Sequence, residues 1–184
     1  MIRILIFFFI LNVCSSASAS IKINIISKLK LTENLSFNFK QKINDKDETG
    51  NCIIKYQKKI YCEYDNINKK IIVSNGTSLV IKNRNSGTFY IYPLKKTPLV
   101  YLLDKNYLIN KIKTSTFRNI NDKYLNYRLI ENNNEINIFF DKKNYNLIGW
   151  QTEDVYQNLT IMFISSIKIN QKINNDLFIL PERD

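Results

Sequence analysis

Short runs in which apolar and polar residues alternate recur along the chain and restrict it to a strand-rich fold. Residues 35–40 alternate in this way, which is typical of a strand with one buried face. Turn signals such as Asn75-Gly76 and Asn85-Ser86-Gly87 separate the runs. The expected strands lie at 35–40, 50–56, 60–64, 71–73, 79–81, 89–92, 124–130, 136–140, 147–153, 159–164 and 166–168. Short antiparallel strands at this spacing predict a sandwich or an open barrel.

Helical patterns interrupt the strands at two places. Apolar residues between positions 21 and 29 recur at helical spacing, and Thr32 and Asn34 follow as breakers. In the middle of the chain, Thr97 is a favourable N-cap and Pro98 suits the first helical position. The apolar stripe of this second helix is Leu99, Leu102 and Leu103.

The first 19 residues have the pattern of a secretory signal peptide. Arg3 supplies a positive start, residues 4–11 are an unbroken apolar run, and Ala17-Ser18-Ala19 is a small-x-small cleavage site. The apolar run is shorter than the ~20 residues that span a bilayer. A lipoprotein signal needs a small residue before its cysteine, whereas Val13 precedes Cys14. We therefore expect residues 1–19 to be removed and residues 20–184 to be exported as one domain without a lipid anchor.

Two cysteines remain in the expected mature chain, Cys52 and Cys62. An even number of cysteines in an oxidising compartment suggests a bridge. The sequence around them reads as two short strands with a polar turn at residues 57–59. Such a hairpin places both cysteines on one face, close together across the ladder. We expect a Cys52–Cys62 disulfide, and the alternative is a pair of buried free thiols.

The composition argues against catalysis. The chain of 184 residues contains no histidine, which excludes Ser/His and Cys/His nucleophile pairs and His-ligated zinc. With four glycines, neither GxGxxG nor GxxxxGK[ST] can be written. The carboxylates at Glu153-Asp154 and Asp45-Asp47-Glu48 fall at expected turns or strand ends, and the cysteines are too far apart for a Cys-x-x-Cys redox motif. We expect no enzymatic activity, metal or cofactor.

The net charge of +11 raises the alternative of binding to nucleic acid or an anionic surface. The basic pairs are dispersed, at Lys58-Lys59, Lys69-Lys70, Lys95-Lys96 and Lys142-Lys143, mostly at expected turns. A solvated face explains them, and export would keep the protein away from nucleic acid. Basic turns would still help docking onto acidic partner proteins or phospholipid headgroups.

An ordered series of motifs covers the expected mature chain. Residues 35–41 end in the Phe-x-Gln motif Phe39-Lys40-Gln41, and residues 50–64 are the expected hairpin, which begins with Gly50. Residues 72–77 read Ile-Val-Ser-Asn-Gly-Thr, and residues 93–99 read Pro-Leu-Lys-Lys-Thr-Pro-Leu. The later matches are Phe140-Asp141, Leu147-Ile148-Gly149-Trp150, Asp154, Thr160, Phe178 and Pro181. Each motif is weak alone, but in this order they resemble the outer-membrane lipoprotein carrier protein (LolA-like) family.

The resemblance implies a mainly β fold with a few helices: an incomplete, curved antiparallel β-barrel (half-barrel) closed by a helical lid. It also implies a periplasmic chaperone, active as a monomer, without catalytic residues or cofactor. Such a chaperone accepts triacylated lipoproteins from an inner-membrane lipoprotein-release transporter and passes them to an outer-membrane lipoprotein receptor. The alternative is a general periplasmic lipid or glycolipid-binding protein with the same fold.

Within that fold, the alternating apolar residues are candidates for the wall of an acyl-chain cavity: Phe37, Phe39, Ile54, Tyr56, Ile60, Tyr64, Leu79, Ile81, Phe89 and Ile91. The lid candidates are Pro98, Leu99, Leu102 and Leu103. Periodicity does not separate a cavity wall from an ordinary core, which is the alternative for all of them. The chain departs from the family at Tyr56-Gln57, where an Arg-Pro is common and the arginine holds the lid. Tyr56 is therefore expected to donate a hydrogen bond to a lid carbonyl.

Overall fold

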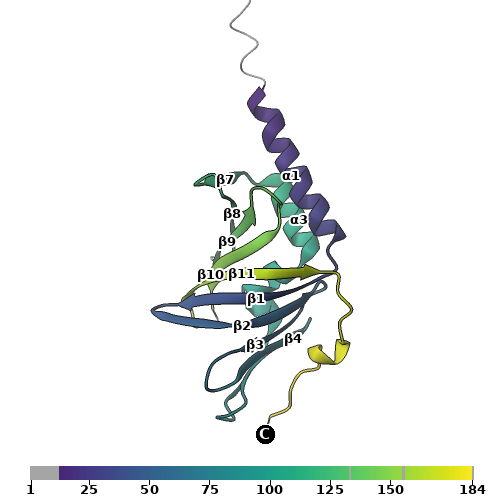
Figure 1. The fold of residues 1–184 in the computed structure, drawn as a ribbon. Helices are drawn as coiled ribbons and strands as arrows, with labels where there is room; N and C mark the ends of the chain where they lie inside the picture. Colours follow the sequence, from purple (N-terminus) through teal and green to yellow (C-terminus); the bar gives the residue numbers. More distant parts are fainter. Residues whose placement is uncertain (1–12, 133, 155, 184) are drawn as a thin grey trace, which may run out of the picture.

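Strands dominate the computed structural model, which describes residues 13–132, 134–154 and 156–183 (Figure 1). Eleven strands in this part of the chain form one antiparallel sheet. Their bounds are β1 Asn34–Ile43, β2 Lys46–Lys55, β3 Lys59–Tyr64, β4 Lys70–Asn75, β5 Ser78–Asn83, β6 Phe89–Pro93, β7 Phe117–Ile120, β8 Tyr124–Glu131, β9 Asn134–Asp141, β10 Leu147–Glu153 and β11 Leu159–Ile169. The order across the sheet is β6-β5-β4-β3-β2-β1-β11-β10-β9-β8-β7.

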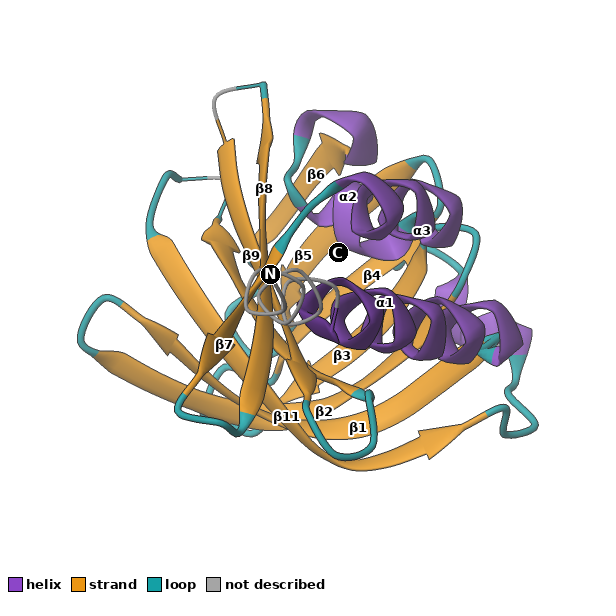
Figure 2. Ribbon diagram, turned by 90° about the horizontal axis from the view of Figure 1, so that it is seen from above, coloured by secondary structure: helices purple, strands orange, loops and turns teal. Residues whose placement is uncertain are grey.

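The sheet is open, and the connection between its two edges covers its concave face. The first strand pairs with the last, β1 with β11, while β6 and β7 are the edges. The chain passes from β6 to β7 through η1 (Leu94–Lys96), α2 (Leu99–Leu103) and α3 (Lys105–Thr114). Figure 2 shows these helices, with α1 (Val13–Leu31), inside the curve of the strands. This confirms the predicted incomplete, curved antiparallel barrel.

The helices bury one stripe each against the sheet. Ile25 and Leu29 of α1 and Leu108 and Ile112 of α3 are buried in the same hydrophobic cluster as the strand residues, and α1 contacts α3. The helix expected from residue 21 is present and already includes Val13. Residues 1–12 of the predicted signal peptide lie outside the described residues.

Several local predictions need correction. Helix α3 and strand β7 were not predicted, and residues 159–164 and 166–168 form the single strand β11. Ser166 (φ 53°) breaks the regular pairing of β11 beside an irregularity between Ser36 and Asn38 of β1. Thr97 does not cap α2 through its side chain, because its hydroxyl donates to the Leu94 carbonyl oxygen over 2.9 Å and Pro98 occupies the N-cap.

The outer face of β3–β5 is also covered. Ile71, Val73 and Val80 alternate with the inward-facing residues of their strands and are nevertheless buried. The C-terminal η2 (Asn175–Phe178) contacts β3 and β4, and the Phe178 side chain is buried there. Apolar residues on both faces explain why residues 71–73 and 79–81 are continuous apolar runs.

A glycine permits close packing at the centre of the curved sheet. Gly50 of β2 lies between Phe39 of β1 and Tyr64 of β3. The Phe39 and Tyr64 rings meet edge to face, with centroids 4.8 Å apart. A Cβ atom on Gly50 would lie 2.0 Å from the Glu63 carbonyl oxygen and 2.8 Å from the Phe39 ring. Only a residue without a side chain fits this position without moving the backbone.

Replacing Gly50 with alanine is therefore expected to destabilise the protein. The added methyl group would force β2 away from β3, with a cost of about 1–3 kcal/mol typical of overpacking. Urea unfolding followed by circular dichroism measures the change. Gly87→Ala is the control for backbone strain alone, because Gly87 has a φ of +67° and nothing lies within 4 Å of an added Cβ atom. A loss in Gly50→Ala no larger than that in Gly87→Ala would contradict the packing argument.

Candidate functional site: an apolar cavity under the helical connection

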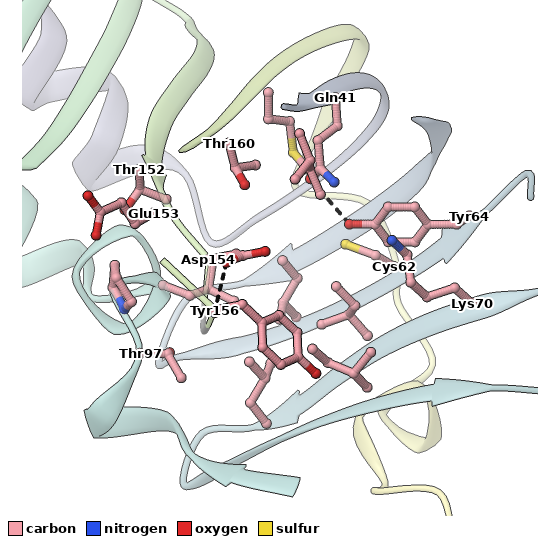
Figure 3. A pocket seen from close by; sticks show the side chains of 18 of the residues that line it. Gln41, Cys62, Tyr64, Lys70, Thr97, Thr152, Glu153, Asp154, Tyr156 and Thr160 are labelled. Atoms are coloured by element: carbon pink, nitrogen blue, oxygen red, sulfur yellow. Dashed lines mark hydrogen bonds between the residues drawn. The ribbon is translucent and has the colours of Figure 1, made fainter. Parts of the chain in front are cut away.

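A cavity of about 290 Å³ opens at one end of the concave face. Strands β3–β6 form one wall, and β1, β10 and β11 form another. Thr97, Pro98 and Leu99 also line the cavity. Figure 3 shows Thr97 across the cavity from Tyr64 and Lys70. Its apolar lining consists of Ile43, Ile60, Cys62, Ile72, Leu79, Ile81, Pro98, Leu99, Trp150 and Met162. The cavity is thus mostly hydrophobic and lies on the concave face.

Strand register decides which residues face this cavity. Ile72 of β4 pairs with Ile81 of β5, and Ile81 pairs with Tyr90 of β6. Directly paired residues share a face of the sheet. Tyr90 therefore lines the cavity, whereas its neighbours Phe89 and Ile91 point to the other face, in contrast to our prediction.

The other eight predicted cavity residues divide into two groups. Four of them line the cavity: Ile60, Tyr64, Leu79 and Ile81. Another four, Phe37, Phe39, Ile54 and Tyr56, are buried in the hydrophobic core shared with the helices. Their part of the concave face is filled because side chains of α1, α2 and α3 pack into it.

The lid residues divide in the same way. Pro98 and Leu99 line the cavity, whereas Leu102 and Leu103 are buried in the core. The predicted lid is therefore a cavity edge at its start and a core element at its end.

A different residue than expected ties the helical connection to the sheet. The Tyr56 hydroxyl makes no hydrogen bond to α2 or α3 in the described structure, and the Lys105 ammonium lies 5.5 Å from the centroid of the Tyr56 ring. The Lys58 backbone N–H instead donates to the Leu103 carbonyl oxygen over 3.2 Å. The Lys58 ammonium also lies 3.2 Å from the Asp104 carboxylate. The hairpin turn thus contacts the end of α2 through Lys58.

One end of the cavity is polar. The Lys70 ammonium donates to both oxygens of Glu48, over 2.7 and 2.6 Å. It also lies 3.8 Å from the centroid of the Tyr64 ring. Gln41 joins the group, because its amide donates to Glu48 over 3.1 Å and accepts from the Tyr64 hydroxyl over 3.3 Å. The alternation of residues 35–40 extended to Gln41 would have placed this amide on the inner face.

Burial raises the pKa of Tyr64 above its ordinary value, and the Glu48 carboxylate adds to the increase. The phenol in the unfolded chain titrates near 10. The folded state therefore favours the neutral phenol, and the stability that this gives is present below pH 10 and is lost as the pH rises above it.

Alkaline unfolding should consequently depend on Tyr64. We expect the urea midpoint of the wild-type protein to fall as the pH rises above about 10, and to fall less steeply in Tyr64→Phe. The exposed Tyr90 provides the control variant Tyr90→Phe, which should follow the wild type. The same pH slope in all three proteins would show that Tyr64 ionisation is not coupled to unfolding.

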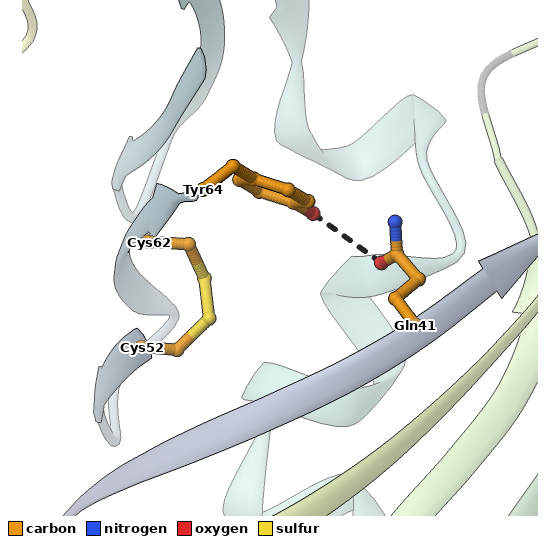
Figure 4. The surroundings of a disulfide bond; sticks show 4 residues. All are labelled: Gln41, Cys52, Cys62 and Tyr64. Atoms are coloured by element: carbon orange, nitrogen blue, oxygen red, sulfur yellow. Dashed lines mark hydrogen bonds between the residues drawn. A yellow bond between two sulfur atoms is a disulfide. The ribbon is translucent and has the colours of Figure 1, made fainter. Parts of the chain in front are cut away.

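A disulfide joins Cys52 of β2 and Cys62 of β3, which pair directly in the sheet (Figure 4). Both residues are buried, and Cys62 lines the cavity. A bridge between directly paired residues fixes the register of this wall and restricts the unfolded chain.

We expect the Cys52 and Cys62 peptides of the purified, unreduced protein to remain unlabelled after alkylation in denaturant. Mass spectrometry after proteolysis measures the label, and reduced protein is the positive control. Reduction should lower the free energy of unfolding by about 2–4 kcal/mol. Alkylation of both peptides without reductant would exclude the bridge.

Comparison with known proteins identifies the family. Residues 30–180 match the family model described as outer membrane lipoprotein carrier protein LolA. The chain therefore belongs to the LolA family. No curated protein matched the sequence.

Solved structures share the fold at low sequence identity. An uncharacterised conserved protein from Thermus thermophilus is 8% identical and has a TM-score of 0.53, with 90% of this chain and 95% of that chain covered. A structure of MucB is 7% identical with a TM-score of 0.50, and the match covers 91% of this chain and 64% of that one. A putative outer membrane lipoprotein-sorting protein domain from Vibrio parahaemolyticus is 8% identical, with 90% and 97% covered and a TM-score of 0.49.

The described residues contain no group of three or more histidine, cysteine, aspartate or glutamate side chains that would hold a metal ion. None of their helices is both long and apolar enough to cross a membrane.

Proposed function

We propose that the protein is a periplasmic chaperone that binds the acyl chains of lipoproteins released from the inner membrane and carries them to a receptor in the outer membrane. The observation that carries this proposal is the apolar cavity at the edge of the helical connection, in a chain of the LolA family. An acyl chain in water costs about 0.8 kcal/mol for each exposed CH₂ group. An apolar cavity removes that cost while the lipid crosses an aqueous compartment.

The size of the cavity supports loading by movement of α2. Sites for drug-sized ligands have volumes of about 300–1,000 Å³, and the cavity of about 290 Å³ lies just below this range. Three acyl chains need more space than one such ligand. In our proposal, the segment from Pro98 to Leu99 moves outward to admit them, and this movement requires the contacts of Lys58 with Leu103 and Asp104 to break.

The proposed partners follow from transport between the inner and the outer membrane. They are triacylated lipoproteins, the inner-membrane transporter that releases them and the outer-membrane receptor that accepts them. The Cys52–Cys62 disulfide supports export, because such bonds persist in oxidising compartments such as the bacterial periplasm. Removal of residues 1–19 by a signal peptidase remains part of the proposal, as does the monomeric state.

A matched pair of substitutions tests the cavity. Ile81 lines the cavity, whereas Ile91 is exposed on the opposite face of the neighbouring strand. Asparagine at position 81 would place an unpaired amide against an acyl chain, which costs about 1–3 kcal/mol. Ile81→Asn should thus lower the affinity for a triacylated lipopeptide about tenfold or more, and Ile91→Asn should not change it.

Titration with a fluorescent triacylated lipopeptide measures both affinities, with thermal unfolding as the control for folding. Lipid extracted from protein purified from the periplasm identifies the natural cargo. Triacylated lipopeptide in the extract supports the carrier role, whereas phospholipid or glycolipid alone would favour a general lipid-binding protein. Equal affinities of the two variants would contradict the assignment of the cavity.

A further inference from the structure

Three polar side chains lie inside the curve of the sheet at one end of the cavity: Gln41 of β1, Thr152 of β10 and Thr160 of β11 (Figure 3). Their exposed fractions are only 4%, 7% and 7%. Thr152 pairs directly with Thr160, and Gln41 pairs with Met162, two residues further along β11. Diagonal neighbours of this kind lie about 7–8 Å apart. The three side chains thus form a polar row beside an apolar wall, with Thr152 directly opposite Thr160 and Gln41 diagonal to Thr160.

The row has unused hydrogen-bonding capacity. The Thr152 hydroxyl is buried and makes no hydrogen bond with any described residue. The Gln41 amide donates one N–H to Glu48 and accepts from Tyr64, which leaves its second N–H free for a ligand. The Thr160 hydroxyl has one long contact of 3.4 Å, to the Asn158 carbonyl oxygen. A buried unsatisfied hydroxyl costs about 1–3 kcal/mol, and a ligand oxygen next to Thr152 would recover that cost.

Charges around the row disfavour an anionic ligand. Lys70, the single lysine among the described residues that line the cavity, is already paired with Glu48. Two further carboxylates, Glu153 and Asp154, line the cavity next to Thr152. The Asp154 carboxylate accepts hydrogen bonds from the backbone of Tyr156 and Asn158, which hold it in place. A ligand carboxylate would add a fourth negative charge to this region.

We propose that the row of Gln41, Thr152 and Thr160 binds the neutral carbonyl group that links an acyl chain to its carrier molecule, as an amide or an ester. This inference rests on the proposed function and specifies its ligand. The hydrocarbon lies against the apolar wall, and a linkage oxygen accepts a hydrogen bond from the Thr152 hydroxyl, while the Gln41 N–H on the far side of β11 is available to a second linkage. The site therefore selects acyl groups joined by amides or esters over free fatty acids.

Two probes with the same chain length separate these ligands. N-methyldodecanamide carries the neutral linkage, and dodecanoate is an anion near neutral pH. Calorimetric titration at constant salt gives both affinities for the wild type, Thr152→Val, Thr152→Ser and Thr49→Val. Valine keeps the shape of Thr152 and removes its hydroxyl, whereas serine retains the hydroxyl. The exposed Thr49, which bonds Asp65, controls for the substitution itself.

The wild type should bind the amide more tightly than dodecanoate. Thr152→Val should weaken amide binding by about 3- to 10-fold, the value of one hydrogen bond, and should leave dodecanoate binding unchanged. Thr152→Ser and Thr49→Val should bind the amide as the wild type does. Because Thr152→Val removes an unsatisfied group, its thermal midpoint without ligand should equal or exceed that of the wild type, which distinguishes lost recognition from misfolding.

The experiment distinguishes failure of the linkage site from failure of the proposed function. Equal binding of the two probes by the wild type, or unchanged amide binding by Thr152→Val, would overturn the linkage site and leave an unselective acyl cavity. Binding of neither probe, nor of the triacylated lipopeptide, would contradict the proposed function and this inference together.

Discussion

The structure depends on the need to keep one face of an open sheet away from water. A sheet that closes into a barrel buries its inner face by itself, but here β6 and β7 remain unpaired with each other. The apolar concave face must then be covered by other elements. The chain covers it with the connection between those two edges, and α1 adds a second helix. The helices fill only part of the concave face, and the remaining part is the cavity.

Hydrophobic periodicity predicted most of the strands but not the exact faces of all of them. In residues 35–40 only one set of alternate positions is apolar, so the inner face was evident. In β6, residues 89–92 are all aromatic or aliphatic, and alternation cannot separate Tyr90 from Ile91. The pairing of Tyr90 with Ile81 of β5 places Tyr90 on the inner face. Long-range register of this kind is not encoded in a local pattern.

Helix α3 illustrates a second limit. Leu108, Ile109 and Ile112 are buried at helical spacing, but the stripe is short, and lysines and asparagines fill the remaining positions from residue 105 to residue 113 apart from Tyr107. The actual N-cap is Asp104, whose side chain accepts from the Tyr107 backbone N–H over 3.0 Å.

A local pattern also does not show which inward-facing residues line the cavity. Phe37 and Leu79 follow the same alternation, yet one packs in the core and the other lines open space, because the difference depends on which helix lies opposite.

The C-terminal segment covers the outer face of β3–β5, so the two walls of the cavity are expected to differ in how easily they bend. Side chains pack against both surfaces of these strands, and the disulfide between β2 and β3 joins the same region covalently. On the other side, Phe163 of β11 is exposed on the convex surface. We therefore expect the β3–β5 wall to resist bending. When the cavity expands to take bulky cargo, we expect the β10–β11 wall to bend and α2 to move outward, while β3–β5 keep their shape.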